Sequence, residues 1–356
     1  MNRSESAMAP NWGALIKEIG RGAHGARALG EEDAYRMFAA MLDGAVPELE
    51  LGGIMIALRI KGESVAELRG FQRAAVERMQ RLVAPAGAPR PVVLPSYNGA
   101  RRQPNLLPLL ALLIARAGCP VLIHGVLDDF GRVTSAAILH ELGIEPSRSA
   151  AEAEAALAAG RIAFLAVDAF APGVALLLAL RKRLGVRGSA HTTAKLLDPF
   201  GGRGLPVVSV THPDYLVRMR DYFAATGDDA LLMRGAEGEP FANPRRQPQI
   251  ELLRGGKCSV LVEQGESDAP VLPTAIDAVA TAHWIRQVLA GEQPVPEPLV
   301  QQLACCCYAA GRTEDFNQAL ALARELARPV APAPLCNNPS ASLEQESGQT
   351  GISCNP

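Results

Sequence analysis

The part of the sequence best suited to chemistry is the stretch 96–105, SYNGARRQPN, which we call the 96–105 loop. An apolar run typical of a buried strand precedes it, and an apolar helical pattern follows it. A turn between the carboxyl end of a parallel strand and a helix N-terminus is where α/β folds bind phosphate. Such loops hold phosphate with the backbone N–H groups of glycines, but here only Gly99 remains, and Arg101 and Arg102 follow it. The loop therefore predicts an anion site built on guanidinium groups.

Basic residues also gather near other predicted turns. The segment 181–220 holds eight basic residues against two acidic ones. If these turns meet at one sheet edge, they form a positive groove suited to phosphates, whereas a solvated helix face is the alternative for a run such as RKR. Few aromatic residues accompany them, which favours contacts to a nucleic-acid backbone over base recognition. The candidate phosphate-contacting residues are Arg101, Arg102, Arg132, Arg181, Lys182, Arg183, Arg187, His191, Lys195, Arg203, Arg245 and Arg246.

Histidines and carboxylates near the predicted strand ends are weaker candidates. His124 ends a predicted strand and could act as a general base, but no nucleophilic Ser or Cys accompanies it, so structural hydrogen bonding is favoured. Asp128 and Asp129 are adjacent on a turn, and we interpret them as exposed surface charge. Glu237 and Glu239 are the remaining acidic candidates. We predict no catalytic residue and no metal site.

The chain holds seven cysteines, three of them consecutive at positions 305–307 in an apolar helical context. Consecutive helical residues point in different directions, so these three thiols cannot easily converge on one ion. A reduced cysteine behaves as a small hydrophobic residue. We therefore predict buried structural cysteines rather than a zinc site.

Composition excludes several classes of protein. The chain has 356 residues, 48% of them hydrophobic and 20% charged, with a formal net charge of −2. No global field draws it to nucleic acid or membranes, so any such attraction must come from local asymmetry. The N-terminus lacks the apolar core of a signal peptide, and no apolar run is long enough to span a bilayer. We expect a cytoplasmic protein without a membrane partner.

Helices dominate the first part of the chain and alternate with strands in the rest. Residues 11–80 predict successive helices at 31–42, 49–60 and 64–80, the last opened by a capping-box pattern. After a Pro-rich linker, the predicted strands are 92–94, 121–124, 162–167, 207–210, 230–233, 250–253 and 259–262. Helices are expected near 104–117, 132–142, 150–159, 214–225, 272–289, 295–309 and 313–327. Such alternation predicts an α/β sheet.

These patterns divide the chain into three parts. We assign residues 1–82 to a helical-bundle domain, residues 90–328 to an α/β domain and residues 329–356 to a disordered tail without apolar periodicity. The segment 172–195 is helical for longer than a simple crossover needs. We expect it to pack back on the N-terminal helices.

Motifs spread over residues 12–328 resemble the anthranilate phosphoribosyltransferase and nucleoside phosphorylase superfamily. They are EEDAYRMFAAMLDG, IALRIKGESVAELRGF, SYNGARRQPN, HGVLDDFGRVTSAAILHELGI, RKRLGVRGSAHTTAKLLDPF and ALLMRGAEGE. The resemblance implies the nucleoside phosphorylase/phosphoribosyltransferase fold: an N-terminal helical domain, completed by helices at about 172–195, and a larger α/β domain with a mostly parallel central sheet. It also implies a homodimer formed through the helical domain.

Several motifs of this superfamily are altered here. The diphosphate loop of the transferases reads Gly-Thr-Gly-Gly-Asp, where this chain has SYNGA at 96–100. Their magnesium-holding Asp-Gly-Leu-Asp-Glu becomes EGEPF at 237–241, and Pro240 and Phe241 cannot hold a metal. A phosphoribosyl diphosphate enzyme without those carboxylates loses the ion that neutralises its leaving group. These departures argue against transferase activity.

The same departures are similar to the anthranilate phosphoribosyltransferase-like DNA-binding branch of the superfamily, the YbiB type. That resemblance implies binding of the DNA or RNA backbone with little sequence preference, through a basic groove and without a cofactor. The alternative is a phosphoribosyl or other glycosyl transferase that acts on anthranilate or a related amine or base, with magnesium as cofactor. In that case the substrate-binding residues would be Ser96, Asn98, Gly99, Asn105, His124 and Arg132.

Overall fold

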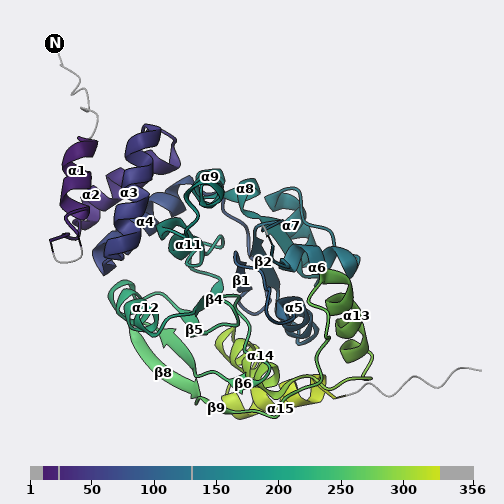
Figure 1. The fold of residues 1–356 in the computed structure, drawn as a ribbon. Coiled ribbons are helices and arrows are strands. Elements are labelled where there is room, and N and C mark those ends of the chain that lie inside the picture. The colour runs from purple at the N-terminus through teal and green to yellow at the C-terminus, as the bar shows by residue number, and fades with distance from the viewer. Residues whose placement is uncertain (1–10, 23–24, 130, 329–356) are drawn as a thin grey trace, which may run out of the picture.

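The computed structural model describes residues 11–22, 25–129 and 131–328, and it has a helical part beside a larger α/β part (Figure 1). The helical part starts with α1 (Trp12–Ile19), α2 (Glu31–Leu42), α3 (Glu48–Lys61) and α4 (Val65–Arg78). The predicted capping box opens α4, since the Ser64 and Glu67 side chains each accept a backbone N–H of the other residue. The predicted N-terminal helices are confirmed.

Four short helices from the middle of the chain complete this part: α8 (Val167–Phe170), α9 (Pro172–Ala179), α10 (Arg181–Leu184) and α11 (Ser189–Ala194). Helix α9 packs on α2 and α4, and α11 packs on α3 and α4. The predicted return of 172–195 to the N-terminal helices is confirmed. The segment is broken rather than continuous, because Gly185 ends α10 in the left-handed conformation at φ 73°.

Helices α2 and α4 contact each other most closely at Gly70. A Cβ atom at this position would lie 2.4 Å from the Glu31 carbonyl oxygen and 2.7 Å from the Tyr35 backbone nitrogen. We expect Gly70→Ala to lower the free energy of unfolding by about 2–3 kcal/mol, because the added carbon forces the two backbones apart. Urea unfolding followed by circular dichroism measures this. Gly13→Ala in α1, where the new Cβ has ordinary contacts, is the matched control, and an equal effect of both variants would contradict the prediction.

The α/β part is built on a seven-stranded sheet with the order β3-β2-β1-β4-β5-β7-β8. The first five strands in this order are parallel, and β7 and β8 are antiparallel additions. A separate two-stranded sheet pairs β6 with β9. The main strands are β1 (Val92–Ser96), β2 (Val121–Gly125), β3 (Ala163–Ala166), β4 (Leu205–Val210), β5 (Ala230–Arg234), β7 (Ile250–Arg254) and β8 (Lys257–Val262), and the minor ones are β6 (Arg246–Gln247) and β9 (Gly265–Glu266). The predicted mostly parallel sheet is confirmed.

The central strands are apolar on both faces because helices cover both. In β1, Val92 and Leu94 join the core beneath the helices on one face, while Val93 joins the core shared with the helical part. The consecutive cysteines of α14 are fully buried in the first of these cores, as predicted. The helices of the α/β part are α5 (Leu107–Arg116), α6 (Ser135–Glu141), α7 (Ala150–Ala158), α12 (Pro213–Thr226), α13 (Ala278–Leu289), α14 (Glu297–Ala309) and α15 (Phe316–Leu326).

Differences from the predicted elements are few. The helix expected from residue 272 begins only at Ala278, where Asp277 caps its N-terminus. The tail at 329–356 lies outside the described residues. Within the described part of the chain, no helix has the length and apolar character needed to cross a bilayer.

Candidate functional site

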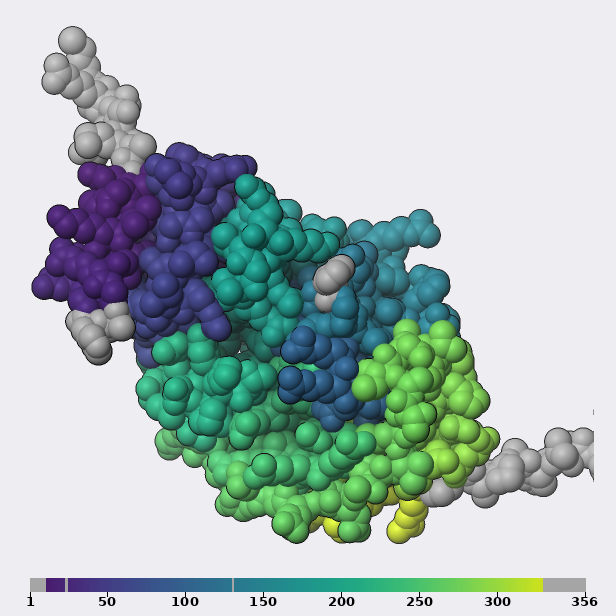
Figure 2. Space-filling view, viewed as in Figure 1, coloured from purple at the N-terminus to yellow at the C-terminus, as the bar shows by residue number. Residues whose placement is uncertain are grey.

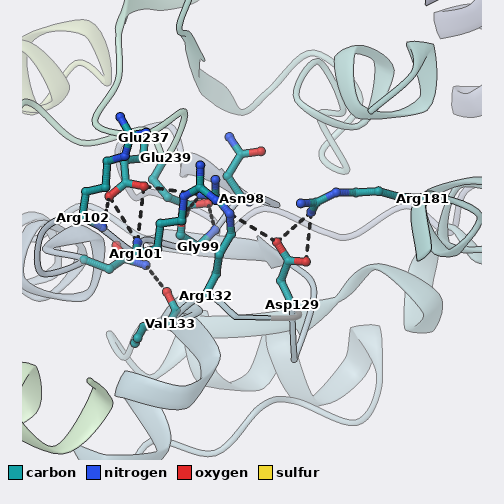
Figure 3. A network of polar contacts seen from close by, with 11 residues as sticks. Asn98, Gly99, Arg101, Arg102, Asp129, Arg132, Val133, Arg181, Glu237 and Glu239 are labelled. Carbon is teal, nitrogen blue, oxygen red and sulfur yellow. Dashed lines mark hydrogen bonds and ion pairs between the residues drawn. The ribbon is translucent and has the colours of Figure 1, made fainter. Parts of the chain in front are cut away.

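The candidate site lies where the loops after β1, β2 and β5 meet. All three strands run in parallel within one sheet, so their carboxyl ends reach the same edge. Ala100 of the 96–105 loop pairs with Val133 of the loop after β2, and the Arg132 guanidinium donates to the Gly99 carbonyl at 3.0 Å. Figure 3 shows the turn after β5 lying against this pair of loops.

The carboxylate of Glu239, on the turn after β5, is fully buried against the 96–105 loop. Its oxygens accept hydrogen bonds from the backbone N–H of Asn98 at 2.7 Å and of Gly99 at 2.8 Å (Figure 3). The Ser96 hydroxyl donates to the same carboxylate at 2.6 Å. Donors that in a phosphate loop would face a ligand are therefore bonded to a side chain of the protein itself.

Glu237 makes the corresponding contacts at the rim of the loop. Its carboxylate accepts from the backbone N–H of Arg102 at 2.8 Å and of Arg101 at 3.2 Å. It also forms an ion pair with the Arg132 guanidinium at 3.5 Å. Two carboxylates of one turn thus hold the backbone N–H groups of four loop residues, at Asn98, Gly99, Arg101 and Arg102.

The turn that carries these carboxylates, residues 236–239, is itself fixed in place. The Gly238 carbonyl accepts from the Lys195 ammonium and from the Ser209 hydroxyl, both at 2.8 Å. A side chain at Gly238 is excluded, since φ is +89° and a Cβ would lie 2.0 Å from Asn98 Nδ2. Sequence reasoning considered the two glutamates only as acidic candidates for magnesium. The signal that it missed is their pairing with a loop whose N–H groups need an acceptor.

The magnesium of the superfamily does not fit this turn. Both oxygens of Glu239 face hydrogen-bond donors of the 96–105 loop, which would also face a cation placed there. Phe241 is fully buried in the core. A divalent cation requires oxygen ligands on its near side, so these residues are not a magnesium site.

Several of the basic candidates are neutralised by ion pairs. The Arg181 guanidinium contacts both oxygens of Asp129, at 2.7 and 2.9 Å. The prediction that Asp129 is exposed is wrong: its side chain is 12% exposed, against 88% for Asp128, because Arg181 reaches it from α10. Two further pairs lie at the surface, namely Lys182 with Asp128 at 4.0 Å and Arg183 with Glu48 at 3.1 Å.

Three other basic candidates lie inward, at the junction of the two parts. The Lys195 ammonium donates to two backbone carbonyls, and burial lowers its pKa to about 8. Burial also lowers the pKa of Arg187 to about 10 and that of His191 to about 3. Within the described residues, Nε and Nη2 of Arg187 and Nδ1 of His191 have no hydrogen-bond partner. All three residues line a cavity of about 160 Å³, and Figure 2 shows a hollow on this face between the teal and the blue segments.

The remaining basic candidates are exposed, but the structure does not place them all at one edge. Arg101 and Arg102 are exposed on the 96–105 loop. Arg245 and Arg246 are exposed where the chain enters β6 in the separate small sheet. Arg203 lies just before β4, at the amino end of that parallel strand, and therefore at the sheet edge opposite the loop. The structure does not bring Arg203 into the predicted groove.

The predicted substrate-binding residues come together, yet they are bonded to one another or to the protein. The Asn105 side chain donates to the Ser135 hydroxyl at 3.1 Å, and Ser135 contacts Ser96 at 2.8 Å. His124 Nδ1 lies 2.7 Å from the Tyr97 hydroxyl, so the predicted structural role of His124 is confirmed. Ser135 was not singled out in the sequence.

The two buried histidines predict loss of stability in acid. Burial holds the pKa of both His124 and His191 at about 3, against an ordinary value of 6.5. Between pH 6.5 and 3 the unfolded chain binds more protons than the folded one, so stability falls as the pH falls. Each histidine contributes up to about 1.4 kcal/mol per pH unit in this window. Urea unfolding from pH 7.5 to 5.0 measures the slope, and His191→Asn should reduce it. An unchanged slope in that variant would contradict the prediction.

Comparisons with known proteins agree with this geometry. Residues 14–79 match a family model described as glycosyl transferase family, helical bundle domain. The uncharacterized protein YbiB of Escherichia coli K12 is 48% identical over 309 residues, which cover 86% of this chain and 97% of that protein. The anthranilate phosphoribosyltransferase of Novosphingobium aromaticivorans is 28% identical over 306 residues, covering 83% of this chain and 91% of that enzyme.

Solved structures extend the comparison to the fold. The anthranilate phosphoribosyltransferase of Thermus thermophilus has a TM-score of 0.72 at 25% identity, covering 88% of this chain and 94% of its own. The enzyme of Saccharomyces cerevisiae, in complex with PRPP and Mg, has a TM-score of 0.66 at 14% identity over 89% of this chain and 93% of its own, which shows the fold alone. The predicted fold class is confirmed. The chain therefore belongs to the YbiB family, a branch of the anthranilate phosphoribosyltransferase superfamily.

Proposed function

We propose that this protein is a cytoplasmic nucleic-acid-binding protein that contacts the DNA or RNA backbone with little sequence preference. The observation that carries the proposal is the occupation of the 96–105 loop. Its backbone N–H groups are bonded to Glu237 and Glu239, while the side chains of Arg101 and Arg102 on the same loop are exposed. The described residues supply no carboxylate partner to either guanidinium. The loop therefore offers positive charge outward rather than a small phosphate pocket inward.

Arginine suits this role for a physical reason. A guanidinium is planar and always charged, and it makes paired hydrogen bonds to phosphate oxygens. The exposed ion pairs of Lys182 and Arg183 hold these side chains weakly, because such pairs contribute about 0–1 kcal/mol in water. A nucleic-acid phosphate can replace Asp128 or Glu48 as their partner. These residues support the loop arginines as further contacts.

A salt titration tests the proposal. We expect a fluorescein-labelled 20-nucleotide strand to bind at 50 mM salt, and two unrelated sequences to bind within about threefold of each other. Log affinity should fall with log salt at roughly 0.7 per neutralised phosphate for a single strand and 0.9 for a duplex. Fluorescence anisotropy measures both. The absence of binding to single and double strands at 50 mM salt would overturn the proposal.

We also propose that two copies associate through the helical part. Leu49 and Ile60 of α3 are 85% and 68% exposed, and they border an apolar groove between α1 and α3. Burial of such side chains against a second copy stabilises a dimer by about 25 cal/mol for each Å² of apolar surface removed from water. Sedimentation equilibrium tests this: a monomer at 50 μM would refute the dimer.

A second candidate function is transfer of a phosphoribosyl group to anthranilate or a related amine. It is favoured by the polar atoms at the domain junction that lack partners within the described residues, on Arg187, Ser189, His191 and Thr193. Buried polar groups without partners are costly, and a bound substrate would satisfy them. Incubation with phosphoribosyl diphosphate, magnesium and anthranilate tests it. Magnesium-dependent loss of anthranilate fluorescence would establish transfer, and an unchanged signal would exclude it for this substrate.

A further inference from the structure

We propose that the Glu237 carboxylate is a built-in substitute for a phosphate group, and that a phosphate of the ligand displaces it from the 96–105 loop. The inference rests on the proposed function, since it names how the nucleic-acid backbone gains access to that loop. It assigns to Glu237 the role of a competitor that limits affinity. Glu239, by contrast, remains in place as part of the fold.

The donor set around Glu237 is one that a phosphate would use. Two consecutive backbone N–H groups, of Arg101 and Arg102, donate to its oxygens at 2.8–3.3 Å. The Arg132 guanidinium lies 3.5 Å away and completes the set. Consecutive backbone N–H groups that point to one side, together with a guanidinium, form a common anion-binding arrangement. Figure 3 shows the carboxylate on the side of the loop from which Arg101 and Arg102 extend.

Glu237 is the carboxylate that can be exchanged, and Glu239 is not. Glu239 is fully buried and accepts three hydrogen bonds of 2.6–2.8 Å. Glu237 has longer contacts, and its side chain is 13% exposed at the rim of the loop. A ligand approaching from solvent therefore reaches the donors of Glu237 first.

The backbone at Glu237 favours its release. Its φ of +54° is the only positive value among the non-glycine residues of the described chain. This conformation costs energy for a residue with a side chain, and such strain concentrates at functional sites. Relaxation of the turn after the carboxylate leaves offsets part of the energy of breaking its contacts. The negative charge of Glu237 meanwhile repels an incoming phosphate.

The test uses the variant Glu237→Asn, since asparagine tolerates a positive φ and carries no charge. Two probes are titrated: inorganic pyrophosphate by isothermal calorimetry, and a labelled 20-nucleotide strand by fluorescence anisotropy. We expect the variant to bind both probes about tenfold more tightly than the natural chain, because a like charge is removed from the site. Glu145→Gln, which removes an exposed carboxylate, is the control for net charge and should change neither affinity by more than twofold.

The outcomes separate this inference from the proposed function. Tighter pyrophosphate binding by Glu237→Asn without strand binding by either chain would support the displacement and refute nucleic-acid binding. Equal or weaker binding of both probes by the variant would overturn the displacement. If Glu237→Asn does not fold, Glu237→Gly replaces it, because glycine adopts this φ without strain.

Discussion

Replacing Arg101 and Arg102 together with alanine is expected to weaken binding of a 20-nucleotide strand about a hundredfold at 50 mM salt. Each guanidinium makes charge-assisted hydrogen bonds to phosphate worth about 1.5 kcal/mol, or about tenfold each. The slope of log affinity against log salt should fall by about 2, roughly 1 for each lost contact. Fluorescence anisotropy at four salt concentrations from 50 to 200 mM measures both quantities.

The controls for this prediction come from the structure itself. Arg101 and Arg102 are exposed, so the double variant should unfold within about 0.5 kcal/mol of the natural chain. Arg203→Ala removes an exposed arginine at the opposite sheet edge and should change the affinity by less than twofold. An equal loss in both variants would mean that net charge alone governs binding, and it would contradict a localised site.

Replacing Glu239 with alanine is expected to lower the free energy of unfolding by about 3–5 kcal/mol. The carboxylate is fully buried and accepts from Ser96, Asn98 and Gly99. Its removal leaves three donors without a partner, each at a cost of about 1–3 kcal/mol, partly relieved by water. Urea unfolding followed by circular dichroism measures the difference.

Two further variants define the origin of this effect. Ser96→Ala removes one of the three donors together with its contact to Ser135, and it should cost about 1–2 kcal/mol. Glu145→Ala removes an exposed carboxylate and should change stability by less than about 0.5 kcal/mol. A loss below about 1 kcal/mol for Glu239→Ala would mean that water replaces the carboxylate fully, and that the loop does not depend on it.

These predictions treat the 96–105 loop and the 236–239 turn as one unit. Asn98 and Glu239 lie 141 residues apart in sequence. The loop has side chains where a diphosphate loop has glycines, and the turn supplies the carboxylates that satisfy the remaining N–H groups. The arginines that follow Gly99 are then free to face solvent. The loop thus changes from a pocket that encloses a small anion into a surface that can contact an extended one.

The sequence by itself determined the local structure and the fold class. Apolar runs of four to six residues predicted the seven strands of the main sheet, since strands covered on both faces have near-continuous apolar side chains. The Ser64–Glu67 pattern predicted the start of α4, because a capping box needs residues only three positions apart. The burial of the α14 cysteines followed from their apolar helical context.

Only the tertiary structure decided which charges are free. Arg181 is paired with Asp129, 52 residues earlier, and Arg203 lies at the wrong edge because its segment enters a parallel strand rather than leaving one. Glu237 and Glu239 face the loop only because β5 and β1 lie on either side of β4 in one sheet. Hydrophobic periodicity reports local burial. The partner of a charged group depends instead on distances between distant segments, which become short only after the chain has folded.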